Sequence, residues 1–186
     1  MFRKKIIWLV VLLAAISLST ACDQADEANK FVDEANAAIE KAKTNNTKIS
    51  SLTSEVLGDK LVKAEDASAF VADNKAKFDE LISLNEQNEK GLTEASAKFE
   101  QASKVKVDEK FKEYVGVKAQ ELKKRAEIYK GDATLCKAML AEKDNEKINK
   151  LIEESNKKTE GLVKEADDLK AKAEKIIKDN PAVFKK

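Results

Sequence analysis

The sequence predicts an all-α protein whose mature part is an antiparallel up-down-up-down bundle of four long helices. The chain is rich in Ala, Lys, Glu and Leu, which are good helix formers, and it contains one Pro and five Gly in 186 residues. Its apolar residues recur at alternating spacings of four and three, which is typical of helices with coiled-coil-like heptad packing.

Four apolar stripes divide the mature chain into helical segments. They cover residues 28–56, 67–102, 111–140 and 148–176, and extending each of the first three beyond its last apolar residue lands on Lys or Glu. A straight continuation would turn those charges into the core, so each stripe must end at a turn. Counted between the turns, the helical segments have roughly 34 to 42 residues, so each is about 50 to 60 Å long at 1.5 Å per residue.

The turns are expected at three places. Gly58-Asp59 follows the first stripe. The second turn falls between Ser103 and Asp108, a stretch without Gly or Pro in which Asp108 can cap the next helix. If the chain does not turn there, the second and third segments form one very long, kinked helix. The third turn lies near Lys143, and Pro181 follows the last stripe, as is usual beyond a helix end.

Polar residues interrupt the apolar stripes. The interrupting asparagines are Asn46, Asn74, Asn85 and Asn88. Such residues set the register of packed helices and cost stability. Charged residues are expected on the exposed faces, where Glu pairs with Lys or Arg four residues later, as for Glu94 with Lys98 and Glu121 with Arg125.

The first 21 residues have the pattern of an export signal. Residues 1–5 include Arg3, Lys4 and Lys5, residues 6–16 are apolar throughout, and small residues follow. The apolar run is shorter than the roughly 20 residues that span a bilayer as a helix. We therefore expect residues 1–21 to be a signal peptide and residues 22–180 to be the helical domain.

The end of this signal, Ser19-Thr20-Ala21-Cys22, resembles the lipobox of bacterial membrane lipoproteins. The resemblance implies that the Cys22 sulfur receives a diacylglycerol, that the chain is cut before Cys22, and that the new amino group is acylated, for example with palmitate. Ser19 departs from the pattern, which usually has Leu there. Ser19 and Ala21 would also suit an ordinary signal peptidase, and Cys22 would then stay unlipidated.

Composition argues against several functional classes. The chain contains no His, the usual general base and the commonest metal ligand, and it has no Gly-rich phosphate loop. Without the signal, 35 − 3 = 32 basic residues stand against 34 acidic ones, a net charge of −2 with the signs interspersed. This pattern disfavours a nucleic-acid surface. We expect no catalytic residues, no metal site, no cofactor, no small-molecule substrate and no enzyme activity.

The remaining cysteine and the C-terminus have simple interpretations. Cys136 lies on the third stripe, where we expect a small, inert core residue far from Cys22, too far for a disulfide. Residues 181–186 are expected to form a solvated basic tail.

Three functions fit these features. The first is a lipid-anchored lipoprotein of the bacterial cell envelope, facing the periplasm or the cell exterior, with a structural or protein-binding role. The second is a membrane-active or lipid-binding amphipathic protein, although the stripes are narrow and rich in Ala and Asn. The third is a peptidoglycan-tethered spacer, because the acylated cysteine, heptads and terminal Lys186 look similar in layout to the major outer-membrane lipoprotein of enteric bacteria.

Overall fold

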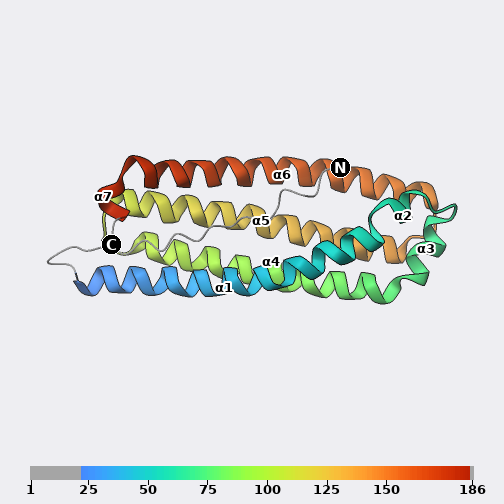
Figure 1. The fold of residues 1–186 in the computed structure, drawn as a ribbon, viewed down its shortest axis with the longest axis horizontal. Coiled ribbons are helices and arrows are strands. Elements are labelled where there is room, and N and C mark those ends of the chain that lie inside the picture. The colour runs from blue at the N-terminus through green and yellow to red at the C-terminus, as the bar shows by residue number, and fades with distance from the viewer. Residues whose placement is uncertain (1–21, 185–186) are drawn as a thin grey trace.

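The computed structural model describes residues 22–184, which are almost entirely helical and contain no β-strand (Figure 1). The helices in this range are α1 (Cys22–Val56), α2 (Asp59–Val62), α3 (Ala67–Asp73), α4 (Lys75–Lys104), α5 (Glu109–Ala141), α6 (Asn145–Asp179) and α7 (Pro181–Phe184). Helices α1, α4, α5 and α6 have 35, 30, 33 and 35 residues. The prediction of an all-α protein built from long helices is confirmed.

The long helices pack side by side along their lengths. Helix α1 packs on α4, α4 on α5, and α5 on α6, and consecutive long helices run in opposite directions in Figure 1. One end of the array holds the start of α1, the α4–α5 connection and α7, and we call it the α7 end. The other holds α2, α3 and the α5–α6 connection, and we call it the α3 end (Figure 1).

The predicted apolar stripes form the core. Phe78, Phe99, Phe111, Ile39 and Leu122 are at most 2% exposed. The buried side chains fall into two clusters, one from the α7 end to the middle of the array and one at the α3 end. Burial of these stripes, at roughly 25 cal/mol per Å² of apolar surface, is the main force that holds the helices together.

The three predicted turns are confirmed, and each has a local cause. Beyond α1, a Cβ atom on Gly58 would lie 2.3 Å from the carbonyl oxygen of Ser54, so only glycine fits. Helix α5 begins where the Asp108 carboxylate accepts hydrogen bonds from the backbone amides of Lys110 (2.7 Å) and Phe111 (3.4 Å). Asp144 caps α6 in the same way. Helices α4 and α5 are therefore separate.

The prediction of one continuous helix over residues 67–102 is wrong. The second segment is divided into α3 and α4 at Asn74, and the short helix α2 precedes it. The Asn74 side chain donates a hydrogen bond to the carbonyl oxygen of Phe70 at 2.9 Å. Asparagine competes in this way for carbonyls that a continuing helix would use, so Asn74 ends α3 instead of acting as a core seam residue.

The expectation of a solvated C-terminal tail is also wrong for the part that the structure describes. Pro181–Phe184 form α7, and Phe184 is 7% exposed. Its ring meets that of Tyr114 edge-on, with 5.3 Å between the ring centroids and 72° between the planes. This is the favoured geometry of an aromatic pair, and it fixes the C-terminal turn against the first turns of α5.

Candidate functional site

The expected lipidation residue, Cys22, is the first residue of α1. The signal sequence with Ser19, Thr20 and Ala21 lies, like the side chain of Cys22, outside the part of the chain that the structure describes. Helix α1 starts at the α7 end, so a lipid on Cys22 would be attached at that end of the array (Figure 1). Within residues 22–184, every helix is too short or too polar to span a bilayer.

The interior of the array contains a buried ion cluster around Glu121, which is fully buried. Lys118 Nζ lies 2.6 Å from one carboxylate oxygen of Glu121, and Arg125 Nε lies 2.8 Å from the other. Arg125 also donates to the Asp167 carboxylate of α6 at 3.2 Å. Spacings of three and four place Lys118, Glu121 and Arg125 on one side of α5, so both oxygens of the buried carboxylate are satisfied.

The expectation that Glu121 lies on an exposed face is therefore wrong. Helix α5 packs between α4 and α6 and needs two buried faces. A single apolar frame predicts only one of them. The second frame runs through the buried residues Tyr114, Val117, Glu121, Ile128, Leu135 and Met139. This second heptad spacing was present in the sequence, and extending it from Tyr114 and Val117 would have placed Glu121 in the interior.

Tyr114 lies within the electrostatic influence of this cluster. Burial, followed by the negative charge of Glu121, raises the pKa of Tyr114 to about 12. Both causes disfavour the tyrosinate form. The phenol therefore stays protonated at neutral pH, and the ring packs as an apolar group against Phe184.

A second polar group, the central amide cluster, joins three helices. Asn45 of α1 donates a hydrogen bond to Asn88 Oδ1 of α4 at 2.9 Å, and Asn88 donates to Asn46 Oδ1 at 2.9 Å. Tyr129 of α5 donates from its hydroxyl to Asn46 Oδ1 at 2.8 Å. Burial raises the pKa of the Tyr129 phenol as well. The bonds can form at one alignment of α1, α4 and α5, so the cluster fixes their register.

The structure brings together two of the four predicted seam asparagines. Asn46 and Asn88 bond to each other as expected of register-setting residues. Asn85 is fully buried but donates to the carbonyl of Leu81 in its own helix, and Asn74 ends α3. The partner Tyr129 lies within the predicted stripe 111–140, but apolar periodicity does not indicate which group its hydroxyl will bond.

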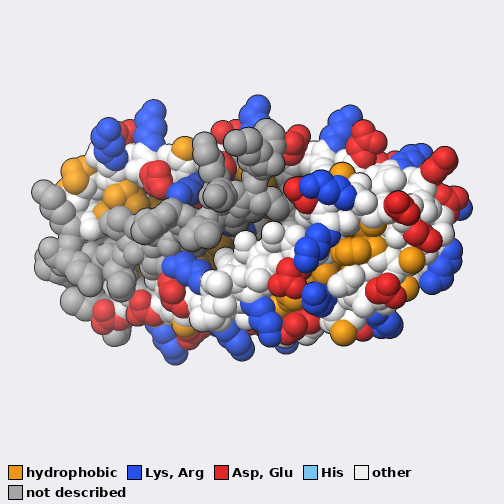
Figure 2. Space-filling model, turned by 45° about the vertical axis from the view of Figure 1, so that its right-hand side comes forward, with side chains coloured by type: hydrophobic (Ala, Val, Ile, Leu, Met, Phe, Trp, Pro, Cys, Tyr) orange, Lys and Arg blue, Asp and Glu red, His pale blue; other side chains and the backbone are white. Residues whose placement is uncertain are grey.

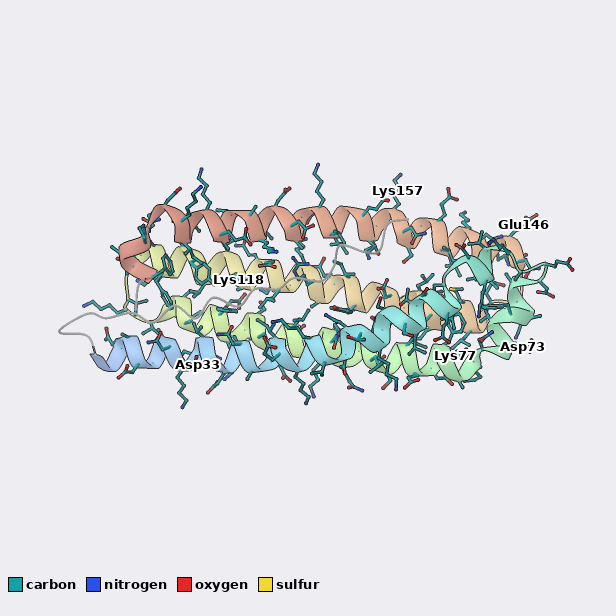
Figure 3. The ribbon with its side chains drawn as sticks, in the orientation of Figure 1. Asp33, Asp73, Lys77, Lys118, Glu146 and Lys157 are labelled. Atoms are coloured by element: carbon teal, nitrogen blue, oxygen red, sulfur yellow. The ribbon has the colours of Figure 1, made fainter. Side chains whose placement is uncertain are left out.

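The charges at the surface link neighbouring helices. Lys98 of α4 pairs with Glu34 of α1 across the helix boundary, and its ammonium lies 5.6 Å from the centre of the Phe31 ring. Similar pairs join Lys123 with Glu100 and Lys124 with Glu165. Figure 2 shows side chains of both charge signs intermixed on the visible face. In Figure 3, Lys157 points outward from α6, whereas Lys118 lies among the helices.

Cys136 occupies the place in the core that the sequence predicts. It is fully buried near the end of α5, in the cluster that includes Phe78 and Met139. That position lies at the α3 end, whereas α1 begins at Cys22 at the α7 end (Figure 1). Its burial makes Cys136 a core side chain that solvent does not reach.

The hydrogen bonds and ion pairs of these clusters hold neighbouring helices together. Within residues 22–184, no group of three or more Cys, Asp or Glu side chains is arranged to hold a metal ion. Comparison of the chain with protein-family models, curated proteins and solved structures finds no match.

Proposed function

We propose that this chain is a lipid-anchored lipoprotein of the bacterial cell envelope, with a structural or protein-binding role and no catalytic activity. Its four long helices act as one antiparallel up-down-up-down bundle with coiled-coil-like packing. The lipid on Cys22 holds the bundle on a membrane, facing the periplasm or the cell exterior.

One observation carries this proposal. The lipobox-like sequence Ser19-Thr20-Ala21-Cys22 follows a basic and apolar leader.

The interior clusters support a structural or binding role. Buried ion pairs and amide bonds cost stability relative to apolar packing, but they select one alignment of the helices. Asn88 is fully buried and bonds to Asn46 of α1. Arg125, which pairs with the buried Glu121, bonds across to Asp167 of α6. A protein that presents a fixed surface to a partner benefits from this alignment.

The two alternatives receive less support. Among the described residues, Val62 is the large hydrophobic side chain that is strongly exposed, so the apolar faces needed for membrane activity are used in the core. A spacer that reaches peptidoglycan through Lys186 needs its two attachment points at opposite ends. Helix α7, which ends at Phe184, lies at the same end of the array as the start of α1 (Figure 1).

Labelling with a palmitate analogue in a bacterial host tests the anchor. The full chain should incorporate the label and sediment with membranes, whereas Cys22→Ser should do neither. Cys136→Ala is the matched control, because it removes the other cysteine and should keep the label. Equal labelling of the Cys22→Ser variant and the full chain would refute the proposal.

Crosslinking tests the binding role. A photo-reactive residue at an exposed position such as Val62 or Lys157 should capture a defined envelope protein in living cells. If capture depends on the bundle, it should be lost in variants that break the central amide cluster without releasing the protein from the membrane.

A further inference from the structure

The absence of a spacer between the expected lipid and the folded domain constrains how the protein meets the membrane. Cys22 is both the expected site of acylation and the first residue of α1, so no flexible residue separates the two among those described. A helix rises only 1.5 Å per residue, and the bundle cannot move away from its attachment point as it could on a disordered linker.

The connection between α4 and α5 lies at the same end as Cys22 (Figure 1). It follows Lys104, the last residue of α4, and runs through Val105, Lys106 and Val107. Val105 has extended backbone angles (φ −70°, ψ 149°), and both valines pack against the core. Lys104, in the last turn of α4, and Lys106, in the connection, are both exposed.

The α7 end carries exposed side chains of both charge signs. Asp26 and Glu27 are exposed in the first two turns of α1, Glu109 is exposed at the start of α5, and Lys175 and Lys178 are exposed in the last turns of α6. The end is thus mixed in sign and would not bind a membrane by charge alone. A lipid on Cys22 would hold this end at the surface, where Lys104 and Lys106 could meet phosphate groups.

We propose that the α7 end lies directly against phospholipid headgroups, with Lys104 and Lys106 in contact with them, and that the bundle stands away from the bilayer. This inference rests on the proposed function. The α3 end, with α2 and the exposed Val62, is then held roughly 50 Å from the surface, the length of the 35-residue helix α1. That end is the part of the molecule offered to a protein partner.

Fluorescence quenching in vesicles tests this orientation. The lipidated protein, purified from membranes, is labelled with one fluorophore at Lys106→Cys or at Val62→Cys, each combined with Cys136→Ala. It is incorporated into vesicles of phosphatidylethanolamine and phosphatidylglycerol that contain a headgroup-nitroxide lipid. The label at position 106 should lose most of its fluorescence, and the label at position 62 should keep it.

A linker variant supplies the matched control. Twenty Gly and Ser residues inserted after Asp23 give an average reach of about 25 Å. They should restore the fluorescence at position 106 without releasing the protein from the vesicles. Persistent quenching in this variant would show that the direct attachment is not the cause and would overturn the inference.

The two proposals fail in different ways. Protein that does not sediment with the vesicles would overturn the lipid anchor and this inference with it. Sedimentation with both labels quenched would mean that the bundle lies flat, and sedimentation with neither quenched would mean that a flexible tether exists. Either result overturns the orientation alone and leaves the anchor intact.

Discussion

Asn88 of α4 donates a hydrogen bond to Asn46 of α1 across 2.9 Å, and the same Asn46 oxygen accepts the hydroxyl of Tyr129 from α5. One amide oxygen thereby ties three helices at a single level of the array. Sliding any one of them by a turn would leave buried polar atoms without partners, which costs about 1–3 kcal/mol for each group.

A double-mutant cycle measures this coupling. Asn46→Ala and Asn88→Ala should each destabilise the protein, and the double variant should lose less than the sum of the two. The expected interaction energy is about 0.5–3 kcal/mol, because the residues share a hydrogen bond. The free energies come from urea unfolding followed by circular dichroism. Thr44→Ala, at an exposed position of α1, should add to Asn88→Ala without coupling.

Glu121 provides a second prediction. Glu121→Gln keeps the shape of the side chain but leaves Lys118 and Arg125 without the buried negative charge. Breaking a buried pair costs about 3–5 kcal/mol, and we expect the lower end of this range because both cations retain slight exposure. Glu127→Gln is the control on the same helix. Its side chain is 53% exposed, and its pair with Lys124 is worth at most about 1 kcal/mol. Equal losses in the two variants would contradict the buried cluster.

Replacing Gly58 and Gly131 by alanine should change the stability of the protein in opposite directions. Gly58→Ala would push a Cβ atom to 2.3 Å from the Ser54 carbonyl oxygen, so the turn after α1 must distort and the protein should lose stability. Gly131→Ala meets no atom within 4 Å in the middle of α5 and should gain about 0.5–1 kcal/mol from helix propensity. Thermal unfolding of both variants checks the pair, and a stabilised Gly58→Ala variant would refute the proposed turn.

The raised pKa of Tyr114 predicts how the stability of the protein changes at alkaline pH. Its folded pKa of about 12 lies above the ordinary value of 10.0, so the folded state keeps the proton longer than the unfolded state. The stabilisation is fully present below pH 10 and disappears as the pH rises from about 10 to 12. Tyrosinate absorbance of the folded protein should therefore rise late. Tyr114→Phe should weaken the loss of stability over this range, and an unchanged profile would contradict the burial of the phenol.

Much of the fold could be predicted from the sequence, since the apolar frames through Ile39, Phe78, Leu122 and Leu162 coincide with buried positions. The interruption at Asn74 could not, because a single side chain that bonds to Phe70 overrides an apolar frame that continues beyond it. A second frame through Tyr114 and Val117 reaches Glu121, but recognising that this frame is also buried requires the knowledge that α5 lies between two helices. The packing of Phe184 on Tyr114 depends on two residues 70 positions apart, which periodicity does not connect.

Mass spectrometry of the amino-terminal peptide from membrane-derived protein tests the lipid anchor most directly. We predict a chain that begins at Cys22 and carries a diacylglycerol on its sulfur, with or without an acyl group on its amino nitrogen. A mature chain that begins at Cys22 or nearby with an unmodified cysteine would contradict the anchor, and with it the account of a bundle held on the membrane at its α7 end.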